Sequence, residues 1–249
     1  MRKFGLIGFP LGHSFSKQYF TNKFMSESIP DCSYENYELE NIDLIKEIIS
    51  GDHELCGLNI TLPYKSDIIK YIDIIDNEAA ESGAVNVLKI SNIGGRRIIK
   101  GYNSDVFGFM ESLAPHLNKI ENAIILGTGG SSKAVAFSLN KLGIGITKIS
   151  RRSGTGFISY NDLTDEMLIK NQLIINTTPL GMFPEINQLP DLNYNCLTPG
   201  HILYDLVYNP LLTAFLKKGK ERGCQTIGGL KMLHLQAERS WEIWNNADI

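Results

Sequence analysis

The feature that most constrains this chain is a glycine-rich turn between an apolar run and a helix-forming segment. The apolar run at residues 124–126 ends in Gly127 and Gly129, and helix-forming residues follow at 133–137. The first glycine permits a tight turn, and the second lets the backbone approach a pyrophosphate closely. The following helix directs free N–H groups and its positive dipole end toward the phosphates. Because Ser132 occupies the third position of the usual G-x-G-x-x-G pattern, an ordinary strand-to-helix turn remains the alternative.

The segment after the next strand bears on which dinucleotide such a site binds. A strand predicted over residues 146–150 is followed directly by Arg151 and Arg152. An NAD site usually places Asp or Glu about 20 residues beyond the glycines, where the carboxylate holds the ribose 2′-hydroxyl. Guanidinium groups instead suit a 2′-phosphate, because they present paired N–H donors. The sequence therefore favours NADP over NAD, with Arg151 as the first candidate, Arg152 as the second and a solvated loop as the alternative.

Composition narrows the class of protein. The chain has 249 residues, of which 43% are hydrophobic, and this length suffices for two modest domains. A net charge of −3 does not favour a general nucleic-acid or membrane-surface binder, and no apolar run approaches a membrane span. The N-terminus shows no signal-peptide pattern. The cysteines are scattered and the five histidines dispersed, so we expect reduced thiols, a cytoplasmic location and no metal site.

Strands and helices alternate along the whole chain, which predicts an α/β fold. Strands are expected at residues 4–9, 34–39, 57–61, 83–90, 97–100, 124–126, 146–150, 202–207 and 224–227. A further strand is expected to begin at residue 173 and to lead into a Pro/Gly turn. Helices are expected at residues 15–26, 42–50, 65–71, 76–82, 105–113, 133–137, 162–170, 211–222 and 230–244. A boundary between two α/β domains falls between residues 101 and 122. The last helix follows the end of the nucleotide unit, so we expect it to pack back on the first domain.

Several polar side chains follow strand ends in the first half, where ligand sites of α/β proteins form. Ser14 and Ser16 lie beyond the first strand, and Ser14 has the alternative role of a helix N-cap. Lys65 follows Pro63 in the first turn of the helix predicted over residues 65–71. A cation is unfavourable at that end of a helix dipole, so its position favours a functional role.

Asp105 and Gln236 are less distinctive when considered alone. Asp105 opens the helix predicted over residues 105–113, where helix capping is the ordinary use of an aspartate. Gln236 lies beside the apolar stripe of the last helix, where a plain surface glutamine is the ordinary alternative.

Seven stretches, in this order, are together specific: the chain resembles the shikimate dehydrogenase family over nearly its whole length. They are HSFS at 13–16, NITLPYK at 59–65, GAVN at 83–86, GYNSD at 101–105, GTGG at 127–130, NTTPLGM at 176–182 and LKMLHLQ at 230–236. The chain departs from the family pattern at Phe15, Lys17, Val87, Ser104, Gly228 and the Ser150-Arg151-Arg152 stretch. These departures bear on fine substrate preference and cofactor affinity, and none removes a predicted catalytic residue.

The resemblance implies a substrate-binding and catalytic domain over residues 1–101 with a mixed, mostly parallel sheet. It also implies a doubly wound Rossmann-type NADP domain over residues 102–226 and a returning helix over residues 227–249. Lys65 and Asp105 are the implied catalytic pair. The implied substrate-binding residues are Ser14, Ser16, Thr61, Lys65, Asn86, Asp105, Tyr208 and Gln236. The implied cofactor-binding residues are Gly127, Gly129, Gly130, Ser131, Ser150, Arg151, Arg152, Thr177, Met182 and Gly229.

The implied reaction is the reversible NADPH-dependent reduction of 3-dehydroshikimate to shikimate in chorismate and aromatic amino acid biosynthesis. A quinate/shikimate dehydrogenase using NAD(P) is the first alternative, since the residues that set the cofactor say little about the substrate. A nucleotide-binding sensor without turnover is the second, and the presence of both Lys65 and Asp105 disfavours it. We expect a small-molecule substrate, no nucleic-acid or membrane partner, and a monomer or homodimer.

Overall fold

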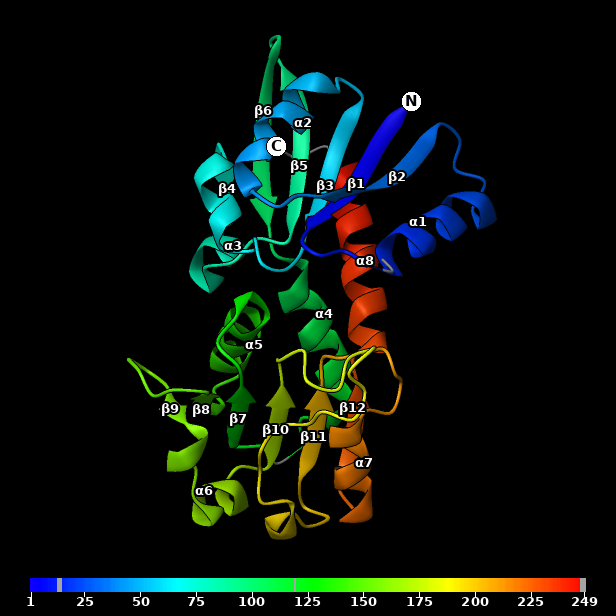
Figure 1. Ribbon diagram of the computed structural model, residues 1–249. Coiled ribbons are helices and arrows are strands. Elements are labelled where there is room, and N and C mark those ends of the chain that lie inside the picture. The colour runs from blue at the N-terminus through cyan, green and yellow to red at the C-terminus, as the bar shows by residue number, and fades with distance from the viewer. Residues whose placement is uncertain (13–14, 119, 247–249) are drawn as a thin grey trace. The chain divides into compact units, whose positions relative to one another are not determined.

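Two six-stranded sheets organise the chain (Figure 1). The structure is a computed structural model, and it describes residues 1–12, 15–118 and 120–246. The chain divides into two compact units, one formed by Met1–Ser104 with Ala237–Ile249 and the other by Asp105–Gln236. The divisions between the units fall after Ser104 and after Gln236. Both observed divisions fall inside helices.

The first unit contains a mixed sheet. Its strands are β1 (Arg2–Gly8), β2 (Cys32–Glu38), β3 (Leu55–Ile60), β4 (Ile74–Ile75), β5 (Val87–Ile93) and β6 (Arg96–Tyr102), in the order β2-β1-β3-β5-β6-β4. β1 runs parallel to β2 and β3, and β4 runs parallel to β6. β5 is antiparallel to both of its neighbours, β3 and β6. Its helical segments are α1 (Phe15–Ser26), η1 (Ile42–Leu44), α2 (Ile45–Gly51), η2 (Asp67–Tyr71) and α3 (Asn77–Ser82).

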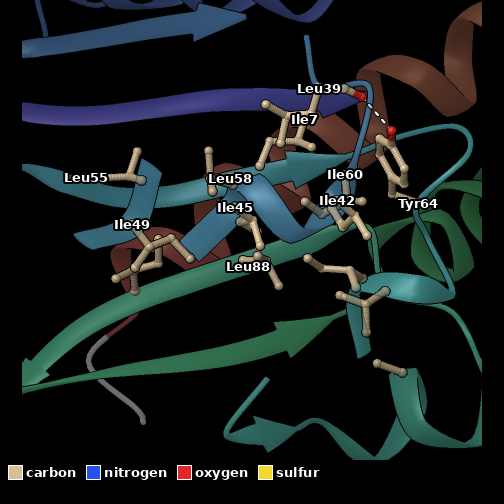
Figure 2. Packing of buried hydrophobic residues seen from close by; sticks show 14 residues of the cluster. Ile7, Leu39, Ile42, Ile45, Ile49, Leu55, Leu58, Ile60, Tyr64 and Leu88 are labelled. Carbon is tan, nitrogen blue, oxygen red and sulfur yellow. Dashed lines mark hydrogen bonds between the residues drawn. The ribbon is translucent and has the colours of Figure 1, made fainter. Parts of the chain in front are cut away.

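Apolar side chains bury both faces of this sheet. On one face, side chains from β1, β3 and β5 meet those of α2, as Figure 2 shows for Ile7, Leu58, Ile45 and Leu88. On the other face, aromatic residues of α1 pack with β1, β2 and the end of the last helix. Trp244 of that helix stacks on Phe4 and donates a 3.0 Å hydrogen bond from its indole nitrogen to the Leu88 carbonyl.

The second unit contains an all-parallel sheet. Its strands are β7 (Asn122–Leu126), β8 (Gly145–Ser150), β9 (Ile158–Ser159), β10 (Leu173–Asn176), β11 (Ile202–Asp205) and β12 (Gln225–Gly228), in the order β12-β11-β10-β7-β8-β9. The order reverses between β7 and β10, which is the switch point of a doubly wound dinucleotide-binding fold. The predicted fold class is therefore confirmed.

Helices cover both faces of the second sheet. They are α4 (Ser104–Leu113), α5 (Gly130–Lys141), α6 (Asp165–Lys170), α7 (Ala214–Glu221) and α8 (Leu230–Asn245), with short turns η3 (Ala114–His116), η4 (Tyr160–Asp162) and η5 (Tyr194–Cys196). Residues of α4, α5 and the first turns of α8 share one core with the sheet. Residues of α6 and α7 share the other. Met232 of α8 thus packs in the second unit, whereas Ala237 and Trp244 pack in the first.

The helix predicted over residues 65–71 is wrong in its first part. Residues 62–66 form turns, and only the 3₁₀ helix η2 follows, at Asp67–Tyr71. The carbonyl oxygen of Lys65 accepts a 2.7 Å hydrogen bond from the Val85 amide, so a neighbouring segment takes the acceptor that an α-helix would use. The helix-dipole argument for Lys65 therefore fails.

Other differences lie at the ends of elements. α6 begins at Asp165 rather than at 162, because Thr164 caps it through the Met167 amide. α7 begins at Ala214 rather than at 211, because Thr213 caps it. The two-residue strands β4 and β9 are too short for a recognisable alternating pattern, and the sequence did not predict them.

Candidate active site

The glycine-rich turn joins β7 to α5 as predicted. Gly127 has φ +111°, and a Cβ atom there would lie 2.6 Å from Oγ1 of Thr177, so this position requires glycine. Gly129 is the N-cap of α5, and a Cβ atom there would meet nothing within 4 Å. Ser132 replaces the third glycine, and its buried hydroxyl donates a 2.7 Å hydrogen bond to the Gly127 carbonyl. The serine thus stabilises the turn.

Four predicted cofactor residues lie in one row at the carboxyl edge of the second sheet. The strand register aligns Ile149, Leu126, Asn176, Asp205 and Gly228 across neighbouring strands. The residues one position further along are therefore Ser150, Gly127, Thr177, Leu206 and Gly229. This is the edge at which doubly wound sheets bind their ligands.

Close contacts bind this row together. The Thr177 hydroxyl donates a 2.7 Å hydrogen bond to the Leu126 carbonyl, which joins the ends of β7 and β10 at the switch point. A Cβ atom on Gly229 would overlap the carbonyl oxygen of Leu206, so glycine is required for this close approach. Gly127 and Gly229 are therefore required by close approach to neighbouring atoms, and Thr177 contributes through its hydroxyl.

The residues of this edge fit NADP. The open space at Gly129 and the first turn of α5, with Gly130 and Ser131, suit a pyrophosphate at a helix N-terminus. Arg151 and Arg152 are exposed directly after β8, and guanidinium groups are donors of the kind that suit a 2′-phosphate. Met182, 40% exposed, lies in the loop after β10. The donor set matches a phosphorylated dinucleotide.

The first unit gathers three predicted residues at one edge of its sheet. The Thr61 amide donates to the Ile7 carbonyl at 2.9 Å, and the Ile60 amide donates to the Asn86 carbonyl at 2.8 Å. Thr61 and Asn86 therefore lie on neighbouring strand ends. Lys65 is held in the same place through its carbonyl bond to Val85, and its side chain is only 9% exposed.

Asn86 also holds the start of α4. Its amide oxygen accepts a 2.7 Å hydrogen bond from the Ser104 amide, and its amide nitrogen donates to the Ser104 hydroxyl at 3.0 Å. Asp105 is buried in the first turn of α4, which begins one residue earlier, and is the first residue of the second unit. The capping alternative for Asp105 is therefore wrong, because the N-cap position precedes Ser104.

A chain of polar side chains extends from Ser16. Ser16 is half-buried in α1 and hydrogen-bonds the side chain of Tyr34, whose pKa burial raises. The Tyr34 hydroxyl donates to the Asn59 amide oxygen at 2.8 Å, and the Asn59 amide nitrogen donates to the Ser240 hydroxyl at 2.9 Å. Sequence reasoning did not single out Tyr34 or Asn59, and the polar Asn59 inside a buried strand was the available signal. Ser14 lies outside the described residues.

Two further predicted substrate residues belong to the second unit. Tyr208 is half-buried, and this burial raises its pKa. Gln236 is half-buried on α8, where that helix approaches Gly108 of α4. A Cβ atom on Gly108 would lie 2.9 Å from the Met232 carbonyl oxygen and 3.2 Å from the backbone nitrogen of Gln236. Gln236 therefore lies at a tight helix crossing and is not a plain surface residue.

Metal clusters and membrane-spanning helices are not found in the part of the chain that the structure describes. Within residues 1–12, 15–118 and 120–246, no group of three or more His, Cys, Asp or Glu side chains is arranged to hold a metal ion. No helix in those residues has both the length and the apolar character needed to cross a membrane.

The chain is similar to known proteins over nearly its whole length. A family model for the shikimate dehydrogenase substrate binding domain matches residues 6–88. Shikimate dehydrogenase (NADP(+)) from Methanococcus aeolicus is 36% identical over 258 residues, which cover 96% of this chain and 90% of that protein. The protein of the same name from Staphylococcus aureus is 37% identical over 258 residues, which cover 99% of this chain and 93% of that protein.

A solved structure extends the likeness to three dimensions. The crystal structure of shikimate 5-dehydrogenase from Thermus thermophilus in complex with NADP(H) and shikimate matches with a TM-score of 0.85. It is 28% identical, and the match covers 98% of this chain and 94% of that one. Because relatives of this identity span nearly all of the sequence and a solved structure shares its fold, the chain belongs to the shikimate dehydrogenase family.

Proposed function

We propose that this chain catalyses the reversible reduction of 3-dehydroshikimate to shikimate with NADPH, in the pathway to chorismate and the aromatic amino acids. The observation that carries the proposal is the row of Ser150, Gly127, Thr177 and Gly229 at the edge of a parallel sheet, in a member of this family. The relatives described above are named for shikimate and NADP(+), which supports the same substrate and cofactor here.

We assign the catalytic role to Lys65 with Asp105 as its charge partner. NADPH, when bound, supplies a hydride to the ketone carbon of the substrate. Negative charge develops on the ketone oxygen during the reduction, and the Lys65 ammonium stabilises that charge and supplies or relays the proton. Asp105 orients the lysine, so the two act as a coupled pair.

The remaining residues position the reactants. Ser14 and Ser16 bind the substrate carboxylate as hydroxyl donors. Thr61, Asn86 and Gln236 hold the ring hydroxyls, and Tyr208 lies beside the substrate, so that one face of the ring meets the nicotinamide. Gly127, Gly129, Gly130 and Ser131 bind the pyrophosphate, Ser150, Arg151 and Arg152 the adenosine 2′-phosphate, and Thr177, Met182 and Gly229 the nicotinamide end.

The proposal includes the predicted division of the chain into domains. Residues 1–101 form the substrate domain, residues 102–226 the NADP domain, and residues 227–249 the returning helix. The acting form is a cytoplasmic monomer or homodimer without nucleic-acid or membrane partners. Free thiols at all four cysteines agree with a reducing compartment.

The test is nicotinamide reduction by the purified protein, with shikimate and quinate each paired with NADP⁺ and NAD⁺. The proposal expects activity with shikimate and NADP⁺ that is lost in Lys65→Ala. Preference for quinate would keep the chemistry and overturn the substrate. No reduction in any of the four pairings, with NADP⁺ still bound, would overturn the catalytic role in favour of a sensor.

A further inference from the structure

A buried carboxylate outside the predicted site ends strand β11. Asp205 is fully buried, and its two oxygens receive three hydrogen bonds from uncharged donors. Oδ1 accepts from the Asn176 amide nitrogen at 2.9 Å and from the Val207 backbone amide at 3.0 Å. Oδ2 accepts from the Thr213 hydroxyl at 2.6 Å. A carboxylate accepts all three bonds, whereas an amide would accept only those at its oxygen and would require the Thr213 hydroxyl to turn round and accept from its N–H group.

The first of these donors belongs to the loop after β10. Asn176 ends that strand, and its amide oxygen accepts hydrogen bonds from the Thr178 amide at 3.0 Å and the Thr178 hydroxyl at 2.6 Å. Its amide nitrogen also donates to the Leu180 carbonyl at 3.3 Å. Asp205 thus orients the Asn176 side chain, which in turn hydrogen-bonds Thr178 and Leu180 in the loop after β10.

The other donors belong to the loop after β11 and to helix α7. Val207 precedes Tyr208, and the Val207 carbonyl accepts a 3.3 Å hydrogen bond from the Gly229 amide. Thr213 caps α7 through the Leu216 amide. The two loops are also joined directly, because the Phe183 amide donates to the Asn209 carbonyl at 3.0 Å. One carboxylate therefore connects the loops that carry Thr177, Met182, Tyr208 and Gly229.

We propose that Asp205 is a positioning residue for the nicotinamide end of the cofactor. Its carboxylate fixes the loops after β10 and β11 in position relative to each other. This inference rests on the proposed function, since it assumes that NADP occupies the edge. Burying a carboxylate costs free energy, and burial here raises the pKa of Asp205 to about 6. An uncharged side chain would avoid that cost. We therefore attribute the presence of an acid at this position to the three hydrogen bonds that converge on it.

The test measures the affinity of the whole chain for two ligands. NADP⁺ carries the nicotinamide, whereas 2′-phospho-ADP-ribose has the same adenosine, 2′-phosphate and pyrophosphate without it. In Asp205→Asn the Kd for NADP⁺ should rise about tenfold, equivalent to about 1.4 kcal/mol, and the Kd for 2′-phospho-ADP-ribose less than about twofold. The exposed Asp191→Asn is the matched control and should change neither value.

The outcomes separate the inference from the function on which it rests. Equal weakening of both ligands, or no weakening of either, would overturn the positioning role. A wild-type chain that binds neither ligand would overturn the cofactor assignment itself, and with it this inference. If Asp205→Asn does not fold, Thr213→Val removes one donor to the same carboxylate and should weaken NADP⁺ about threefold, selectively. Thr213→Ser, which keeps the hydroxyl, should retain wild-type affinity.

Discussion

The hydroxyl of Ser132 donates a 2.7 Å hydrogen bond to the carbonyl oxygen of Gly127, across the turn between β7 and α5. Ser132 stands where the common dinucleotide-binding pattern has a third glycine. In that pattern the third glycine allows the helix and the strand to pack closely. Here the buried side chain of Ser132 occupies that space. The departure from the pattern thus has a structural role of its own.

Replacing this serine should therefore destabilise the turn. In Ser132→Ala the Gly127 carbonyl loses its partner, and the free energy of unfolding should fall by about 1 kcal/mol. Urea denaturation measures this free energy of unfolding, and Ser50→Ala, at an exposed serine, is the control. A change in Ser132→Ala no larger than in the control would show that the bond adds nothing.

Lys65→Ala should lower kcat at least about 100-fold, because general acid catalysis and stabilisation of the developing oxyanion are both lost. The Kd for NADP⁺ should stay within about twofold, since the proposed cofactor residues belong to the other sheet. Steady-state kinetics and calorimetry measure the two values. Lys70→Ala is the control, because Lys70 is exposed and pairs with Asp43. Wild-type kcat in Lys65→Ala would remove Lys65 from the catalytic role.

Arg151→Ala should weaken NADP⁺ binding about tenfold or more and leave NAD⁺ binding unchanged, because only NADP⁺ has the 2′-phosphate. Arg152→Ala tests the second candidate in the same assay and should have the smaller effect. Binding titrations with both dinucleotides measure the ratio. Equal losses for NADP⁺ and NAD⁺ would contradict the assignment of the 2′-phosphate to these arginines.

Arg97 should contribute strongly to stability. Its guanidinium donates to the carbonyl oxygens of Ile49, Asp52 and Leu55 at 2.5–2.6 Å, so it joins the end of α2 to the start of β3. Arg97→Met keeps the apolar stem and should lower the free energy of unfolding by about 2–3 kcal/mol. The neighbouring Arg96→Met, at an exposed ion pair with Asp73, should cost less than about 0.5 kcal/mol. Similar losses in the two variants would refute this role.

Asp205 should make stability depend on pH in a definite direction. Its pKa is about 6 in the folded protein and 3.8 as the ordinary value, so between these values the folded state binds more protons. Stability from this group is therefore fully present below pH 3.8 and is lost as pH rises through about 6. The loss is at most about 3 kcal/mol.

Urea denaturation of the wild type and Asp205→Asn from pH 4 to 7 measures this contribution. The wild type should lose stability relative to the variant as pH rises, because asparagine does not titrate. A difference between the two proteins that stays constant over this range would show that the Asp205 carboxyl has no raised pKa.

Local patterns in the sequence were enough to predict five of the six strands of the second sheet. The apolar runs of β7, β10 and β11 and the glycines after β7 have strong local conformational preferences, so their structure follows from short windows. The alignment of Ser150, Gly127, Thr177 and Gly229 in one row came from the strand register of the folded sheet. Membership of the family was predicted from seven short motifs that occur in the family's order.

What the tertiary structure decided depends on hydrogen bonds between segments far apart in the chain. Lys65 lies in a turn rather than a helix because Val85 occupies its carbonyl, and Asn86 holds the start of α4 through Ser104. α8 looks like one amphipathic helix in sequence, yet Met232 packs with one unit and Trp244 with the other. The sequence alone determined most of the helices and strands, because their conformational preferences are local. Only the folded chain decided which backbone and side-chain groups pair across it, because those partners are brought together by packing.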